Sequence, residues 1–168
     1  MGEEIGMLAK DVHQLSRELH PSILDDLGLT AALRAECGAF SRQYGIPVRF
    51  EPSAIPEGLS SAISLGLYRI AQESLRNVGK HSRATAVRVT LAASERVEQS
   101  DGIGDTVRLV IEDNGSGFDL EQIKGRRGLG LVSMEERVRL VEGNLAIRSQ
   151  PGSGTAVEVR IPVRRSAS

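Results

Sequence analysis

Three polar side chains between residues 73 and 80 have the types and the spacing expected of a metal and phosphate site. Each residue of an α-helix advances about 100°, so Glu73, Asn77 and Lys80 fall on one narrow stripe of a helix. Apolar residues of the same segment, Leu67 and Ile70 among them, occupy the adjoining face. An amide oxygen beside a carboxylate suits a hard, hydrated cation such as Mg2+, and a lysine one turn further suits phosphate. The stripe therefore predicts a site for a metal ion and a phosphate group.

Two glycine-rich segments downstream could complete this site. Asp113 closes an expected strand and begins the segment 113–117 (Asp-Asn-Gly-Ser-Gly), where a carboxylate could accept a hydrogen bond from an exocyclic amine and glycines would let a flat base approach the backbone. Segment 128–131 (Gly-Leu-Gly-Leu) opens an expected helix, whose free N–H groups favour phosphate. Each segment alone has a plainer interpretation as an ordinary turn or helix start. Their joint order and spacing favour the functional interpretation.

The cations near these segments also have plain interpretations. Lys80 and His81 lie near the expected C-terminus of a helix, where positive charge complements the helix dipole without any ligand. Arg126 and Arg127 precede the second glycine segment and are more often a solvated charge pair, although they could reach a phosphate.

The elements that must position these residues follow from hydrophobic periodicity. Apolar residues from Ile5 to Leu19 repeat at spacings of 3 and 4, as in a helix that packs in coiled-coil fashion, and Pro21 ends this pattern. Gly143 is expected at the C′ position of the helix that it follows. The further expected elements are helices over 30–44, 59–79 and 129–142, a strand over 46–50, a hairpin of 87–91 and 107–111 with an expendable tip at 94–105, and a hairpin of 145–149 and 156–163. This order predicts an α+β fold, a two-layer sandwich of mostly antiparallel sheet covered by helices, with an N-terminal helical extension.

Composition agrees with one compact domain and excludes several classes. The chain has 168 residues, a net charge of −1, 3% aromatic residues and no Trp, which argues against a nucleic-acid partner. Its single cysteine, Cys37, has no partner for an internal disulfide and is expected to be buried and inert. No apolar stretch approaches 18 residues and no signal peptide opens the chain, so we expect a cytoplasmic segment without membrane contact, whose parent protein could still be membrane-anchored.

These segments together resemble a known family. Residues 72–82 are similar to the N box, and residues 113–117 and 128–137 to the two glycine boxes, of the ATP-binding fold shared by sensor histidine kinases, type II topoisomerases, Hsp90 chaperones and mismatch-repair ATPases (the GHKL or Bergerat fold). Within it, the match is to the catalytic domain of two-component sensor histidine kinases of the nitrate-sensor and lipid-desaturation-sensor subfamily. The resemblance covers about residues 5 to 163 and implies ATP and Mg2+ as cofactors.

The resemblance implies a role for each matching residue. Asn77 would be the Mg2+ ligand, and Glu73 a general base or a carboxylate of the metal shell. Asp113 would hold the exocyclic amino group of adenine, with Thr155 nearby through water. The other implied ATP-binding residues, which would contact phosphate or ribose or shape a lid over the triphosphate, are Lys80, His81, Gly115, Gly117, Gly128, Leu129, Gly130 and Leu131. Residues 116–127 are expected to be mobile without nucleotide and ordered with it.

The resemblance also implies a division of the chain and a set of partners. Residues 1–44 would be the end of a dimerisation hairpin and its linker, and residues 45–165 the ATP-binding catalytic domain. Pro21 follows His20 where the family's phospho-acceptor histidine is followed by an acid, so the acceptor is expected on an upstream dimerisation domain of a homodimeric parent, with a response regulator as the next partner. The alternative is a serine kinase of the same fold that acts as an anti-sigma regulator, or a domain that only binds nucleotide.

Overall fold

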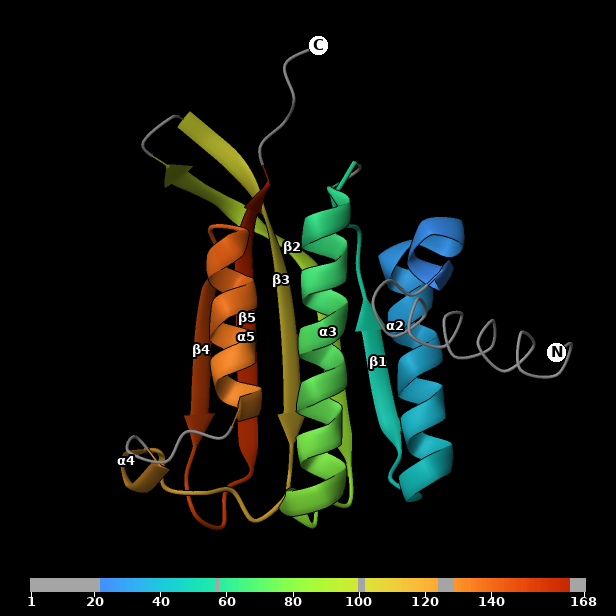
Figure 1. Cartoon of the computed structure of the whole chain (residues 1–168), viewed down its shortest axis with the longest axis vertical. Coiled ribbons are helices and arrows are strands. Elements are labelled where there is room, and N and C mark those ends of the chain that lie inside the picture. The colour runs from blue at the N-terminus through green and yellow to red at the C-terminus, as the bar shows by residue number, and fades with distance from the viewer. Residues whose placement is uncertain (1–21, 57, 100–101, 124–128, 164–168) are drawn as a thin grey trace, which may run out of the picture.

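The described chain forms one sheet with helices packed on it (Figure 1). The computed structural model describes residues 22–56, 58–99, 102–123 and 129–163; the coiled-coil pattern of 5–19 and His20 lie outside these ranges. The described elements are α2 (Ser22–Tyr44), β1 (Val48–Pro52), α3 (Ser61–Asn77), the π-helix η1 (Val78–Ser82), β2 (Val87–Gln99), β3 (Gly102–Asp113), α4 (Leu120–Ile123), α5 (Leu129–Leu140), β4 (Asn144–Ser149) and β5 (Thr155–Val163).

The sheet has the strand order β1-β2-β3-β5-β4. The β1–β2 pair is parallel, and the other three pairs are antiparallel. Helices α3 and α5 lie side by side on one face of this sheet (Figure 1). The expected α+β sandwich with a mostly antiparallel sheet is confirmed. In the part of the chain that the structure describes, no helix is long and apolar enough to span a bilayer.

Helix α3 lies at the centre of the molecule because its sequence is amphipathic. Ser60 caps the N-terminus, where its hydroxyl accepts a hydrogen bond from the backbone N–H of Ile63 at 3.2 Å. Its inner face carries Leu67, Ile70 and Leu75, all essentially inaccessible to solvent. The polar stripe that includes Glu73 and Asn77 lies at the edge of this buried face.

Helix α2 belongs to the same core as the rest of the domain. Its buried residues Leu33, Cys37 and Phe40 are part of one cluster with the residues of α3 and the sheet. The burial of Cys37 confirms the expectation for that residue and raises the pKa of its thiol to about 12. The buried residues of α2, α3 and the sheet thus form one cluster, and the division of the chain into residues 1–44 and 45–165 stays a prediction.

Three element boundaries differ from the sequence expectations. Helix α2 joins two helical parts across Gly28, whose backbone is non-helical (φ 79°, ψ 173°); the part after Gly28 agrees with the expected helix over 30–44, and the part from Ser22 was not expected. Strands β2 and β3 run through the polar segment 94–105, which was expected to be a loose tip. The left-handed residue after α5 is Glu142 (φ 54°), so Gly143 is at C″, where its N–H bonds the carbonyl of Val138 at 2.9 Å.

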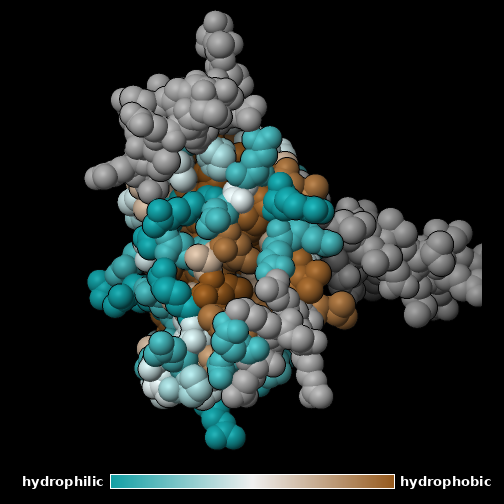
Figure 2. Space-filling view, turned by 90° about the vertical axis from the view of Figure 1, so that its left-hand side faces the viewer, coloured by the Kyte–Doolittle hydropathy of each residue, from teal (hydrophilic) through white to brown (hydrophobic). Residues whose placement is uncertain are grey.

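Helix α5 exposes apolar surface on its outer side. Its exposed large apolar residues are Leu129, Val132 and Leu140. Figure 2, which views the side of the molecule formed by β4 and α5, shows apolar surface between hydrophilic side chains. Met134 and Val138 of the same helix are buried and hold α5 on the sheet.

The face of the sheet opposite the helices carries a charge cluster around Glu158. Arg108 and Arg160 lie directly opposite each other in the β3–β5 register, and this like-charge pair would be unfavourable alone. The Glu158 carboxylate accepts from both Nε atoms, at 2.8 and 2.7 Å, and lies 3.3 Å from Nη1 of Arg148. The hydrogen bond from Arg108 is the largest cause that lowers the pKa of Glu158 from 4.5 to about 2.

We therefore expect Glu158→Gln to destabilise the fold at pH 7 by about 1–3 kcal/mol, because charged hydrogen bonds are lost. Because the pKa of Glu158 is lower in the folded state than in the unfolded state, its ionised carboxylate stabilises the fold above pH 4.5. This stabilisation is lost as the pH falls through about 2. Urea unfolding of both proteins from pH 7 to pH 2 should therefore show their stabilities converging. Glu51→Gln, at a half-exposed ion pair, is the control; a constant difference between parent and Glu158→Gln would contradict this assignment.

Candidate functional site

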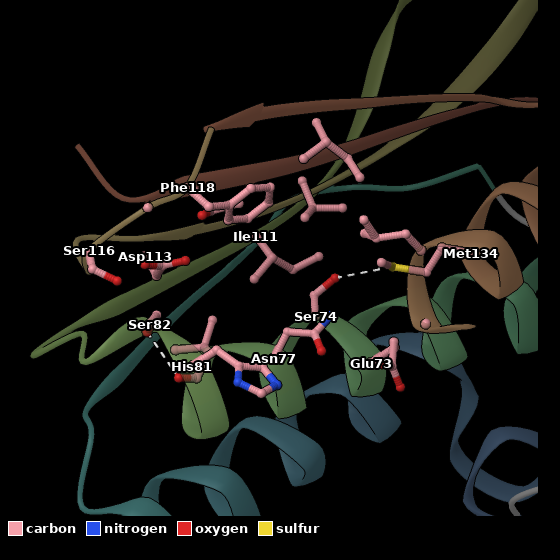
Figure 3. A pocket seen from close by; sticks show the side chains of 17 residues that line it. Glu73, Ser74, Asn77, His81, Ser82, Ile111, Asp113, Ser116, Phe118 and Met134 are labelled. Atoms are coloured by element: carbon pink, nitrogen blue, oxygen red, sulfur yellow. Dashed lines mark hydrogen bonds between the residues drawn. The ribbon is translucent and has the colours of Figure 1, made fainter. Parts of the chain in front are cut away.

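A cavity of about 420 Å3 lies between α3, η1 and α5 on one side and the sheet on the other. Figure 3 shows its polar side chains at two ends: Asp113 near Ser116 and Ser82 at one, and Glu73 at the other. Apolar side chains complete the lining: Ile111 lies between these ends, and Met134 lies at the end with Glu73. The cavity is therefore suited to a ligand with a flat apolar part and a separate charged part.

The wall formed by α3 and η1 contains most, but not all, of the polar stripe. Glu73, Asn77 and His81 line the cavity, whereas Lys80 is exposed and is not among its lining residues. The predicted stripe assumes α-helical spacing as far as Lys80, but the chain changes to a π-helix at Val78. A π-helix has a wider turn, so the residues after Asn77 depart from the expected stripe, and His81 takes the place on the cavity wall that was expected for Lys80.

Asp113 ends β3 at the opposite end of the cavity. Its Oδ1 atom accepts a hydrogen bond from the N–H of Gly115 at 2.8 Å, and its carboxylate also accepts from the N–H of Thr155, its partner in the β3–β5 register. Burial is the largest influence on this group and raises the pKa of Asp113, while the two N–H groups act in the opposite direction. A carboxylate has about four acceptor positions, so Asp113 retains capacity for a ligand donor.

Thr155 is placed beside Asp113, as the sequence anticipated, and lines the same end of the cavity. Its hydroxyl is 2.9 Å from that of Ser149, which also accepts a hydrogen bond from the N–H of Phe118. Asn114 has a structural role here, because its Oδ1 atom accepts from the N–H groups of Thr85 and Ala86. The plain turn interpretation thus holds for Asn114, while Asp113 points to the cavity (Figure 3).

The glycines after Asp113 are required by packing of the chain on itself. A Cβ atom at Gly115 would collide with the carbonyl oxygen of Ser82, and one at Gly117 with that of Gln150. Gly154 is equally constrained, because a Cβ atom there would collide with the carbonyl oxygen of Asp113. The sequence assigned Gly115 and Gly117 to the approach of a base or the movement of a lid. The structure adds a packing reason for both glycines, because close backbone contacts at this end of the cavity leave no room for a side chain.

The expected lid is partly described. Ser116 donates its N–H to the carbonyl of Ser82 at 2.6 Å and accepts from Gly152 at 2.6 Å. Ser116, Gly117 and Phe118 also line the cavity, so this start of the segment is held in place rather than free. The short helix α4 follows; residues 124–128, with Arg126, Arg127 and Gly128, lie outside the described residues.

The beginning of α5 approaches the carboxylate of Glu73. Gly130 and Leu131 line the cavity, whereas Leu129 is exposed and does not. A Cβ atom at Gly130 would collide with Oε1 of Glu73. Gly130 therefore lets the second glycine segment lie directly against the polar end of α3, which brings together two of the three segments that the sequence singled out.

This contact predicts the effect of a side chain at position 130. Gly130→Ala should force Glu73 or the start of α5 to move and lower any transfer of phosphate by about tenfold or more, while the fold persists. Ser133→Ala, one turn further along α5 at a half-buried position outside the cavity lining, is the matched control. The steady-state rate of phosphate transfer and the thermal unfolding of both variants test this prediction. A parental rate of phosphate transfer in Gly130→Ala would contradict it.

The apolar lining of the cavity was not identified from the sequence. Ile111, Ile147 and Val157 come from three neighbouring strands, and Met134 comes from α5. Met134 is buried and its sulfur lies 3.7 Å from the hydroxyl of Ser74. The period of two in the strands does place Ile147 and Val157 on the helix-facing side, a signal that could have indicated them. Phe118 also lines the cavity.

The donor set fits Mg2+ better than a transition metal. No group of three or more His, Cys, Asp or Glu side chains that could hold a metal occurs among the described residues. Glu73 and Asn77 offer a carboxylate and an amide oxygen one helical turn apart, and both line the cavity. Mg2+ commonly takes one or two protein oxygens and completes its shell with water and phosphate, so these residues suffice for a magnesium ion that enters with a nucleotide.

Known proteins share both the sequence pattern and the fold. The family described as histidine kinase-, DNA gyrase B-, and HSP90-like ATPase matches residues 62–165. The chain is 36% identical over 162 residues to the sensor histidine kinase MctS of Rhizobium johnstonii, with 95% of this chain and 33% of that protein covered. It is 36% identical over 156 residues to the oxygen sensor histidine kinase NreB of Staphylococcus carnosus, with 93% and 42% covered.

Solved structures agree on the fold. The histidine kinase domain of a blue-light-activated histidine kinase from Erythrobacter litoralis has a TM-score of 0.62 and 22% identity, over 80% of this chain and 60% of that one. The ATP-binding domain of PrrB from Mycobacterium tuberculosis has a TM-score of 0.57 and 24% identity, over 81% of this chain and 94% of that one. The arrangement of sheet and helices is thus one that these domains share.

Proposed function

The chain belongs to the family of histidine kinase-, DNA gyrase B- and HSP90-like ATPases, and we propose that its cavity holds Mg·ATP for transfer of the γ-phosphoryl group to a histidine. It is the ATP-binding catalytic domain of a two-component sensor histidine kinase. The chain spans between a third and about two fifths of the length of the curated relatives it matches. The acceptor histidine, an upstream dimerisation domain and a response regulator are therefore parts of the proposal.

One observation carries this proposal, namely the separation of two kinds of polar group by an apolar lining. Asp113 lies at one end of the cavity, Glu73 and the start of α5 lie at the other, and Asn77 lies on the α3 wall between them. A purine base against Ile111 would direct its amino group to Asp113. The triphosphate would then extend towards α3 and the N-terminus of α5, where free N–H groups favour anions.

The residues of the site take the following roles in this proposal. Asp113 accepts a hydrogen bond from the exocyclic amine of adenine, with Thr155 beside it. Asn77 holds Mg2+, and Glu73 is the general base or a carboxylate of the metal shell. Of the other residues implied for ATP binding, His81, Gly117, Gly130 and Leu131 line the cavity and are proposed to contact the phosphates or ribose or to shape the segments around them. Gly115 is proposed to support Asp113, whereas Lys80 and Leu129 lie outside the cavity lining and Gly128 lies outside the described residues. When bound, Mg2+ would neutralise charge that develops on the phosphates during transfer.

Removal of the proposed metal ligand should make ATP affinity largely independent of Mg2+. Asn77→Ala is expected to retain the fold, because its side chain faces the cavity, yet to remove most of the Mg2+ dependence of ATP binding. Calorimetric titrations with and without Mg2+ measure this dependence in the parent and the variant. An equal gain in affinity from Mg2+ in both proteins would show that Asn77 is not the ligand.

Transfer to a separate histidine tests the proposed function. Positioning dominates phosphoryl transfer, and the one described histidine, His81, belongs to the nucleotide site. The chain is thus expected to bind Mg·ATP and to label itself negligibly with γ-labelled ATP. Addition of the upstream dimerisation domain should produce an acid-labile product. Acid-stable labelling would indicate the serine-kinase alternative, and robust self-labelling that His20→Ala abolishes would place the acceptor at His20.

A further inference from the structure

The last residue of α2, Tyr44, lies directly against the π-helix that follows the nucleotide-site helix. A Cβ atom on Gly79 would lie 2.6 Å from the Cε1 and Cζ atoms of the Tyr44 ring and 2.8 Å from Cδ1. Real Cβ atoms essentially never come within 3.0 Å of such neighbours. The ring therefore occupies the space that any larger side chain at position 79 would need, and the glycine lets the backbone of η1 rest on the ring.

The Tyr44 ring is supported from behind. It packs on the buried Phe40, with ring centroids 4.9 Å apart and an angle of 34° between the planes. Helix α2 is also tied to α3 by polar contacts, because Glu36 accepts hydrogen bonds from the Tyr68 hydroxyl at 2.8 Å and from Nε2 of Gln72 at 3.1 Å. A group inserted at position 79 thus meets a half-buried ring that is backed by Phe40.

The nucleotide cavity lies on the other side of the same short helix. Asn77, Val78 and His81 line the cavity, whereas Gly79 does not. A π-helix is a rare and irregular turn that is frequent at functional sites, so its position depends on what packs against it. Within η1, the Ser82 hydroxyl donates to the carbonyl of Val78 at 2.9 Å, and the Ser82 carbonyl accepts the N–H of Ser116 at 2.6 Å, so η1 is held between this loop on one side and the Tyr44 ring on the other.

We propose that Tyr44 is a positioning residue of the nucleotide site. Its ring, packed against Gly79, sets how far η1 projects and so fixes Asn77 and His81 at the cavity wall. The proposal rests on nucleotide binding in this cavity, and it makes the C-terminal end of α2 part of the support of the site. Displacement of that end would therefore change nucleotide affinity.

Gly79→Ala tests the proposal, because its methyl group has to displace the ring or η1. We expect ATP affinity to fall about tenfold. Gly66→Ala is the matched control: Gly66 lies in α3, and a Cβ atom there would have no neighbour within 4 Å, so this variant should bind ATP like the parent.

Tyr44→Ala should also weaken binding, and Tyr44→Phe, which keeps the ring, should restore it. In Gly79→Ala/Tyr44→Ala, the loss should be smaller than the sum of the two single losses.

The imidazole NMR signals of His81 supply a second readout that needs no nucleotide. They should shift in Gly79→Ala and Tyr44→Ala but not in Gly66→Ala or Tyr44→Phe. Parental affinity together with unmoved His81 signals in Gly79→Ala would overturn the role of Tyr44, as would strictly additive losses in the double variant. A parent chain that binds no ATP would overturn the proposed function instead, and the His81 signals would still decide the role of Tyr44. If Gly79→Ala does not fold, the Tyr44→Ala and Tyr44→Phe pair decides it.

Discussion

Asp113→Asn is expected to weaken ATP binding by about 1.5–3 kcal/mol, which is about 10- to 150-fold in affinity. The carboxylate accepts N–H groups from Gly115 and Thr155 and keeps acceptor capacity for the adenine amine. An asparagine has one acceptor oxygen in place of two, so one of these three donors would lose its partner. Isothermal titration with ATP and Mg2+ measures the difference.

The neighbouring carboxylate provides the control for this prediction. Glu112 is half-exposed and lies 4.0 Å from Arg88, and it is one residue from Asp113 on a strand whose side chains alternate between faces. Glu112→Gln should therefore bind ATP like the parent. A purine nucleoside triphosphate without the exocyclic amine should bind the parent weakly and lose little more in Asp113→Asn. Equal affinity of parent and Asp113→Asn for ATP would remove Asp113 from the adenine site.

Glu73→Gln is expected to lower phosphoryl transfer by about 10²- to 10⁴-fold, the usual contribution of a positioned general base. Its carboxylate lines the cavity, lies against Gly130 and is 3.6 Å from Nη1 of Arg76. Because glutamine keeps the shape of the side chain, ATP affinity should change by no more than about threefold. Transfer from γ-labelled ATP to the supplied dimerisation domain, measured in a single turnover, separates these two effects.

Arg76→Gln distinguishes the carboxylate from its ion pair. The Arg76 side chain is 60% exposed, so this pair contributes little and the variant should transfer phosphate nearly as fast as the parent. A Glu73→Gln protein that transfers at the parental rate would refute the role of general base. A loss of affinity as large as the loss of transfer would assign Glu73 to ground-state binding instead.

The sequence predicted the fold well in segments whose hydrophobic periodicity fits only a helix or only a strand. The apolar face of α3 and the alternation in β3 and β5 indicated helix and strands because a buried side requires a regular pattern. The segment 94–105 carried no such pattern, since it is polar and glycine-containing, yet its backbone continues the β2–β3 ladder. The helical part of α2 before Gly28 was missed, because this glycine and Pro21 interrupt the periodic pattern there.

The sequence predicted the site residues whose role depends on the type of side chain. It predicted less well the residues whose position depends on local backbone geometry. Asp113, Glu73 and Asn77 were placed in one cavity, as the sequence anticipated. Lys80 was not, because the change from α- to π-helix at Val78 alters the spacing that its assignment assumed. The collision partners of Gly115, Gly117 and Gly130 come from segments far along the chain, so the sequence could not show what each glycine permits.

Backbone NMR shifts during titration with a non-hydrolysable ATP analogue and Mg2+ test the central claim most directly, and a chain of 18.1 kDa suits the method. We expect saturable shifts at both ends of the cavity, at Asp113 and Thr155 and at Asn77 and Gly130. The open face of the sheet around Arg108 and Glu158 should not respond. Absence of saturable shifts, or shifts confined to surfaces away from the cavity, would contradict the assignment of this cavity as the nucleotide site.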